Sequence, residues 1–351
     1  MTESLDQTAA ACRELRGRYA CDSMSSIVWK RFRRHPGAIA GAVVLAALVL
    51  SILLARFSPY DPVTSSMADR LQPPSWQHPF GTDPLGRDLL TRVLYGGRVS
   101  LAVGLIVVAI ALAIGVPMGA LSGYFGGWVD DLLMRLTDVA LTLPTLLVLI
   151  LLGAVMREVE LPTQNAGPLF ERNNVVVTGG IIGVLSWTAV ARLTRVAFLS
   201  IRELEFVTAA RCVGASNMRI IVQHILPNAV GSIIVGGTLE IGYAIMQESG
   251  LSFLGFGIQP PMPSWGNLLG NAQEHLVRHP WLAIFPGLMI FLTIVSVNYV
   301  GDGLRDAFDA FKVLEQNPSA ERPPSASPTE RRRVRAGVAR RAVARPASTV
   351  S

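Results

Sequence analysis

Residues 205–227 read EFVTAARCVGASNMRIIVQHILP, a polar-flanked stretch between two hydrophobic segments. Apolar residues recur in it at the i, i+3, i+4, i+7 spacing of one helix face, first at Phe206, Ala209, Ala210 and Val213, and again at Met218, Ile221, Val222 and Ile225. Gly214 between the two sets can adopt a left-handed backbone, Ser216 can cap a second helix, and Pro227 limits it. We therefore predict two short amphipathic helices that meet at Gly214 outside the membrane, with apolar stripes that a partner must cover.

The composition of the whole chain is that of a membrane protein. Half of the 351 residues are hydrophobic, 16% are charged, and the mean hydropathy is +0.42, which is too apolar for a soluble globular chain. Uncharged or nearly uncharged runs long enough to cross a bilayer occur at 37–55, 99–121, 136–156, 175–191, 229–255 and 281–300. We therefore predict an all-α polytopic protein with six transmembrane helices, the third bent at Pro144.

Clusters of positive charge set the predicted orientation. Lys30, Arg31, Arg33 and Arg34 precede the first span, and Arg192, Arg195, Arg202, Arg211 and Arg219 follow the fourth. By the positive-inside rule, residues 1–36, 192–227 and 301–351 lie in the cytoplasm, so both ends of the chain are inside. Cys12, Cys21 and Cys212 then lie in the cytoplasm as free thiols.

The chain divides accordingly into four parts. We expect a cytoplasmic segment at 1–36, a first span with an outer loop at 37–98, a core of five spans at 99–311 and a tail at 312–351. The tail is rich in Pro and Ser and then in Arg, which favours a disordered basic segment; contact with anionic lipid of the inner leaflet is the alternative.

The opening stretch resembles the cytoplasmic loop of binding-protein-dependent ABC importer permeases. The family pattern is Glu-Ala-Ala, three residues, Gly, nine residues, Ile, any residue and Leu-Pro, with Thr208 here at the position of the acid and His224 at the position of Ile. In that family the loop is the coupling helix, which docks in a groove of the ATPase subunit. The resemblance implies a coupling role for Glu205, Thr208, Ala209, Ala210, Gly214, Ala215, Leu226 and Pro227. Without it, the stretch is an ordinary amphipathic cytoplasmic hairpin.

Two strings on the outer side resemble the dipeptide, oligopeptide and nickel permeases within that family. The first is FGTDPLGRD at 80–88, continued by GRVSL at 97–101, and the second runs from 248 to 266. Their motif residues are Gly81, Thr82, Asp83, Gly86, Arg87, Asp88, Pro260, Pro261, Trp265 and Gly266. Residues 298–309 resemble the closing motif of the same family.

The fifth predicted span contains the most polar residues. Glu240, Gln247 and Glu248 lie at i, i+7 and i+8, close to one helix face, and are candidates for a translocation path. Glu240 matches no family pattern, and a polar contact between helices is its alternative. His275 and His279 have a spacing that can bind metal, but no third ligand is evident, so we assign no metal site.

The resemblance implies the shorter, C-type permease of a paired importer, with the type I permease fold, in the cytoplasmic membrane of a bacterium. It also implies a second permease, two ABC ATPase subunits and an extracytoplasmic substrate-binding protein as partners, besides the lipid bilayer. Small peptides are the expected solute, with nickel or glutathione as alternatives. No nucleic acid is expected as a partner, because the positive charge at the chain ends suits an anionic membrane surface.

Catalysis within this chain is not expected. Lys30 and Lys312 are the two lysines, and neither stands in a G-x-x-x-x-G-K-[ST] loop, so we expect no cofactor here and assign ATP and Mg²⁺ to partner subunits. No His-Glu-x-x-His, Cys cluster or nucleophile elbow occurs, which disfavours a membrane-embedded enzyme. A secondary transporter driven by protons through Glu240 and Glu248 is the main rival, but it leaves the hairpin at 205–227 without a partner.

Overall fold

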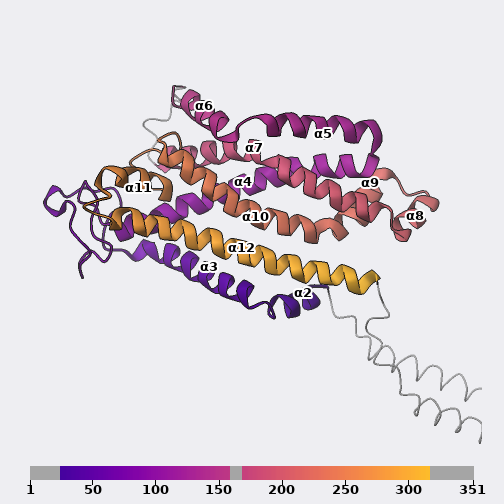
Figure 1. The fold of residues 1–351 in the computed structure, drawn as a ribbon, viewed down its shortest axis with the longest axis horizontal. Helices are drawn as coiled ribbons and strands as arrows, with labels where there is room; N and C mark the ends of the chain where they lie inside the picture. The colour runs from indigo at the N-terminus through magenta and orange to yellow at the C-terminus, as the bar shows by residue number, and fades with distance from the viewer. Residues whose placement is uncertain (1–23, 159–167, 317–351) are drawn as a thin grey trace, which may run out of the picture. The chain divides into compact units, whose positions relative to one another are not determined.

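The computed structural model describes residues 24–158 and 168–316 (Figure 1). Cys12, Cys21 and the basic tail after residue 316 lie outside these ranges, so the predictions for them stay predictions. The chain divides into two compact units, Met1–Phe308 and Asp309–Ser351, and of the second only the helical residues 309–316 are described.

The described residues form helices joined by turns and loops. The α-helices are α2 (Met24–Phe32), α3 (Pro36–Leu54), α4 (Leu89–Phe125), α5 (Gly127–Thr142), α6 (Thr145–Glu158), α7 (Pro168–Arg202), α8 (Glu205–Cys212), α9 (Asn217–Arg219), α10 (Leu226–Phe253), α11 (Trp265–Ala272) and α12 (Trp281–Gln316). A π-helical segment, η3 (Ile220–Ile225), joins α9 to α10, and short 3₁₀ turns occupy η1 (Ala55–Phe57), η2 (Met67–Asp69) and η4 (Gln273–His275).

Five of the described segments are long and apolar enough to cross a membrane. They are Pro36–Phe57, Leu89–Phe125, Asn174–Arg202, Asn217–Phe253 and Trp281–Phe308. A sixth crossing results if Gly127–Thr142 and Thr145–Val155 together make one span. The described helices therefore agree with the predicted polytopic all-α class, with the third span in two pieces.

The break in that third span is sharper than predicted. Instead of one bent helix over 136–156, α5 and α6 meet at an angle of 77°. Leu143, which precedes Pro144, has an extended backbone with φ −74° and ψ 128°. The proline ring disfavours helical geometry at the residue before it, and the helix therefore ends and restarts instead of bending.

The second span begins ten residues earlier than predicted, at Leu89 instead of 99. Asp88 caps this helix, because its carboxylate accepts a hydrogen bond from the Thr91 backbone N–H at 2.8 Å. The predicted boundary between an outer loop ending at 98 and a core beginning at 99 therefore falls inside α4. Hydropathy marks the apolar part of a helix, whereas its ends depend on capping.

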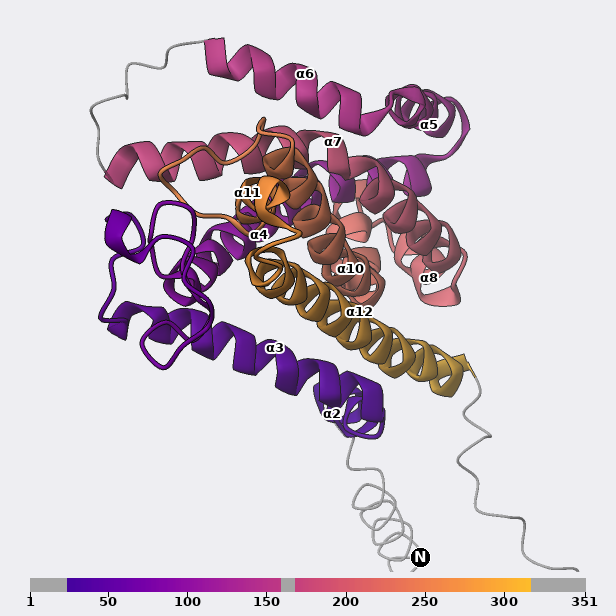
Figure 2. The same cartoon turned by 60° about the vertical axis from the view of Figure 1, so that its left-hand side comes forward.

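Close packing of α4 on α7 forms the centre of the larger unit. A Cβ added at Gly115 of α4 would lie 2.8 Å from Val190 Cβ, and one added at Gly183 of α7 would lie 2.9 Å from Ile110 Cβ. Small residues at both positions let the two backbones approach. Figures 1 and 2 show α4, α7 and α10 side by side, with α5 and α6 on one side of them and α3 and α12 on the other.

Cys212 offers a test of the predicted orientation, because its side chain is exposed in α8. In a chain with Cys12 and Cys21 replaced by Ser, a membrane-impermeant thiol reagent should leave Cys212 unlabelled in intact cells and label it in inverted vesicles. Labelling of Cys212 in intact cells would contradict the orientation and the coupling role of residues 205–227 together.

Candidate functional site

The stretch at 205–227 contains one short helix, α8, that stands apart from the others. The second predicted helix is the beginning of a longer one, because α9, η3 and α10 follow one another without a break. α8 runs from Glu205 to Cys212, and Gly214 follows with φ +86°, the left-handed backbone predicted for it. Ser216 occupies the N-cap position of α9, although its side chain makes no capping hydrogen bond there. The prediction that Pro227 ends the second helix is wrong, because Pro227 lies in the first turn of α10, where its missing N–H costs nothing.

One face of this stretch fastens it to the body of the protein. Val207 is fully buried, and Ile220, Ile221 and Ile225 are buried with it against residues of α4 and α7 such as Phe198. Ala210, Ala215 and Leu226 are partly buried against the same cluster. Val207 was missed by the sequence analysis, since the entry angle of α8, not its periodicity, decides which face points inward.

The opposite face stays exposed and is apolar. The large exposed apolar side chains of the two predicted stripes lie on it, namely Phe206, Val213, Met218 and Val222, of which Val213 is 89% exposed. We call these four residues the α8–η3 surface. Glu205, Thr208, Ala209, Gly214 and Pro227 are exposed beside them. The sequence predicts that this loop lies outside the membrane, where an apolar surface is suited to contact another protein.

The last turn of α4 packs against the loop at 205–227. The Tyr124 hydroxyl donates a hydrogen bond to Asn217 Oδ1 at 2.8 Å, and the Arg211 guanidinium lies 5.4 Å from the centre of the Tyr124 ring. Arg202 donates to the backbone carbonyls of Gly123 at 3.0 Å and Tyr124 at 3.3 Å. A displacement of the loop therefore acts directly on the end of α4.

Tyr124→Ala should loosen the loop, because it removes a buried ring from the cluster under Val207. We expect faster trypsin cleavage after the exposed Arg211 and Arg219. Tyr124→Phe keeps the ring and loses one hydrogen bond, worth about 1 kcal/mol, so its cleavage should stay near that of the unaltered protein. Phe125→Ala, at the exposed neighbouring position, is the control; equal cleavage of all three variants would contradict the anchoring role.

The polar residues of α10 lie in different surroundings. Glu248 is fully buried, and its carboxylate accepts hydrogen bonds from Ser100 of α4 at 2.9 Å and from Ser252 at 2.7 Å. These bonds join α4 to α10, and the predicted place of Glu248 on a translocation path stays a prediction. Gln247 donates to the Tyr243 hydroxyl at 2.5 Å.

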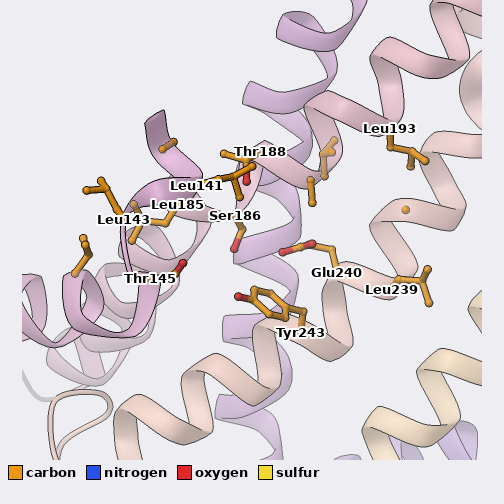
Figure 3. Close-up of a pocket in the computed structure, with 15 residues that line it drawn as sticks. Leu141, Leu143, Thr145, Leu185, Ser186, Thr188, Leu193, Leu239, Glu240 and Tyr243 are labelled. Atoms are coloured by element: carbon orange, nitrogen blue, oxygen red, sulfur yellow. The ribbon is translucent and has the colours of Figure 1, made fainter. Parts of the chain in front are cut away.

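Glu240 lines a cavity of about 450 Å³ between the α5–α6 break, α7 and α10 (Figure 3). Most of the lining side chains are apolar, including Leu141, Leu185 and Leu193. The polar lining residues are Thr145, Ser186, Thr188, Glu240 and Tyr243. Figure 3 shows the Glu240 carboxylate pointing toward Ser186. A volume of this size lies in the range of pockets that bind small ligands.

The first outer motif builds a tight loop in front of α4. The Asp83 carboxylate accepts hydrogen bonds from the backbone N–H of Leu85 at 2.8 Å and of Arg87 at 2.9 Å, and from the Arg87 guanidinium at 2.7 Å. Gly81 and Gly86 have φ of +78° and +72°, which favours glycine there. Thr82 is fully buried and accepts a hydrogen bond from Gln72. With Asp88 as the cap of α4, these motif residues shape the outer loop.

Arg92 belongs to this outer cluster, although the sequence analysis did not single it out. It is 1% exposed, donates to the Pro62 carbonyl at 2.6 Å and lies 3.5 Å from the Asp83 carboxylate. Arg92 lies one helical turn after the capping Asp88, and this spacing is the feature of the sequence that could have predicted its place in the cluster. Arg92 also lines a polar cavity of about 360 Å³ with Asn267 and Glu274.

The second outer motif packs onto the start of α4. Trp265 is fully buried, and its indole N–H donates to the Val93 carbonyl at 2.9 Å. Gly266 lies against the backbone of Ser249, and the Pro260–Pro261 bond is cis. The two outer strings, far apart in sequence, therefore form one structural unit.

Comparison with known proteins identifies the family. Residues 115–312 match the family of binding-protein-dependent transport system inner membrane components, and residues 23–74 match the N-terminal transmembrane domain of oligopeptide transport permease C. The chain belongs to the binding-protein-dependent permease family. This permease is accordingly a multi-pass protein of the cytoplasmic membrane with the type I importer fold, and separate ATPase subunits hydrolyse ATP for it.

Several curated relatives cover most of the permease. It is 39% identical over 287 residues to the dipeptide transport system permease protein DppC of Alkalihalophilus pseudofirmus, covering 80% of this chain and 88% of the relative. It is 41% identical over 283 residues to the glutathione transport system permease protein GsiD of Pectobacterium atrosepticum, with 80% and 89% covered. A putative peptide permease protein of Brucella suis is 38% identical over 282 residues, with 80% and 88% covered.

Proposed function

We propose that this permease imports small peptides across the cytoplasmic membrane as half of a paired translocation unit. The names of the relatives carry this proposal, because dipeptide, glutathione and putative peptide permeases all match it at similar identity and coverage. The match at 23–74 to the N-terminal domain of oligopeptide transport permease C supports the C-type position in the pair. A second, different permease is then needed to complete the path.

We propose that the α8–η3 surface couples the permease to an ATPase subunit. Its exposed apolar side chains flank Gly214, and the residues Glu205, Thr208 and Ala209 lie beside them. Burial of Val207 and Ile225 holds the loop, so that force on the surface reaches α4 and α10. ATP and Mg²⁺ are bound by the ATPase subunits, and this chain takes no cofactor of its own.

We propose further that the cavity at Glu240 lies on the solute path. Helices α5, α6, α7 and α10 meet there, and α10 continues from the coupling stretch through η3. Motion of that stretch would therefore change the shape of the cavity.

Purification of the complex tests the function. The permease, tagged at a chain end, should copurify with an ATPase and a second permease, and the reconstituted complex should take up dialanine only with ATP and a binding protein. A permease that purifies alone and responds to a proton gradient would support the secondary transporter instead.

Glutathione is the second candidate, because GsiD proteins are 41–42% identical to this permease. Competition separates the two candidates in the same reconstituted system. Excess dialanine should suppress uptake of labelled dialanine while excess glutathione does not; the reverse pattern would favour glutathione.

A further inference from the structure

Glu240 carries a carboxylate that the permease itself satisfies only in part. Its side chain is 8% exposed, in the middle of a predicted membrane span. Ser186 of α7 forms a hydrogen bond with it, but Oε1 has no hydrogen-bond partner among the described residues. A charge in such surroundings is unfavourable unless it is paired, so a carboxylate with a spare oxygen suggests a partner from outside the chain.

The nearby cations of α7 are already engaged. The Arg192 guanidinium lies 2.6 Å from the Asp138 carboxylate of α5, and Arg195 donates two hydrogen bonds of 2.6 Å to Asp130. Glu240 is the only Asp, Glu, Lys or Arg among the described residues that line the cavity. The cavity therefore presents an acidic group with no basic side chain among those lining residues.

The other lining groups suit an ammonium ion. The hydroxyl groups of Thr145, Ser186, Thr188 and Tyr243 can each accept a hydrogen bond, and the Tyr243 ring adds a face that attracts cations. The remaining wall is apolar and makes few directional contacts, so it tolerates side chains of different shape. A volume of about 450 Å³ suits a small solute.

We propose that this cavity is a binding site for the primary ammonium group of the transported solute, with the Glu240 carboxylate as its ligand. The inference rests on the proposed function, since a small peptide has one ammonium group at its amino end whatever its side chains are. Glu240 then recognises the constant group and the apolar wall accepts the variable ones.

Protection of a cysteine in the cavity wall tests the site without transport. In membranes containing the assembled importer, Cys12, Cys21 and Cys212 are replaced by Ser, and Thr145→Cys is labelled with a neutral thiol reagent. Dialanine should slow this labelling, and N-acetyl-dialanine, which lacks the ammonium group, should not. Glu240→Gln should raise the dialanine concentration needed for half protection by about tenfold or more, the loss expected for a hydrogen bond between charged groups.

Asp302→Asn is the matched control, because Asp302 is an exposed acid on α12 and does not line the cavity. It should leave protection unchanged. Equal protection in Glu240→Gln and the unaltered chain, or equal protection by the acetylated probe, would overturn the proposal. So would poor recovery of the assembled complex with Glu240→Gln, because that result assigns Glu240 to a contact between helices.

Measurements of dialanine uptake distinguish the ammonium site from peptide import itself. Normal dialanine uptake by the unaltered importer, with no loss in Glu240→Gln, overturns the ammonium site and leaves peptide import standing. Absence of dialanine uptake, together with Glu240-dependent protection by dialanine, supports the site and contradicts peptide import.

Discussion

Gly214→Val is expected to abolish uptake while the permease reaches the membrane in near-normal amounts. Gly214 has φ +86°, and a Cβ built there meets no atom of this chain within 4 Å. The strain of a left-handed β-branched residue costs roughly 1–2 kcal/mol, which a loop outside the membrane can bear. We expect the substitution to weaken binding to the ATPase, because added bulk at this corner opens a gap in the proposed interface.

Two measurements check this expectation. Uptake of dialanine should be lost, and the ATPase should either be lost from the purified complex or no longer respond to loaded binding protein. Thr208→Ala should do much less, because Thr208 already stands where the family has an acid.

Gly255→Val is a matched control for Gly214→Val. Gly255 has φ +83° and likewise leaves an added Cβ without a neighbour within 4 Å, but it follows α10 on the predicted outer side. Its variant carries the same backbone strain and should keep the ATPase bound. Wild-type uptake by a well-expressed Gly214→Val protein would mean that the α8–η3 surface is not the coupling element.

Trp265→Ala should have the largest effect on stability. Trp265 is fully buried in a cluster with Leu89, Val93, Leu268 and Leu282, and its indole N–H bonds to the Val93 carbonyl. Loss of such a side chain leaves a cavity and costs about 3–5 kcal/mol. Since α11 and the start of α4 depend on this contact, the permease should be much less abundant in membranes and should aggregate at a lower temperature in detergent.

Trp76→Ala is the control for that change. Trp76 is fully exposed in the outer loop, so its replacement should change stability by less than about 0.5 kcal/mol. Equal abundance of the Trp265→Ala and Trp76→Ala proteins would show that α11 is not held by this packing.

Much of the fold follows from local sequence. Uncharged or nearly uncharged runs predicted the spans, because a bilayer requires about 20 apolar residues whatever the neighbours are. Gly214 predicted a left-handed corner, and Pro144 predicted an interruption, since both effects act within a few residues of the chain. The family resemblance assigns the coupling role to residues 205–227 from the spacing within a single loop, and that role stays a prediction.

Tertiary structure alone decided which side of each pattern faces inward. The second predicted stripe is split, with Ile221 and Ile225 buried and Met218 exposed, and the first stripe is mostly exposed because α8 packs on α4 and α7 through Val207 instead. Periodicity reports that a helix has an apolar face but not which neighbour covers it.

The two acids of α10 show the same limit. Glu240 and Glu248 lie in the same predicted span, yet Glu248 bonds to Ser252 of its own helix and to Ser100 of α4, whereas Glu240 opens onto a cavity. That difference arises because Ser100 lies 148 positions from Glu248 along the chain and α4 brings it within 2.9 Å. The apolar run around them places both acids in a membrane helix, whereas the packing of α4, α7 and α10 leaves Oε1 of Glu240, and no oxygen of Glu248, without a hydrogen-bond partner among the described residues.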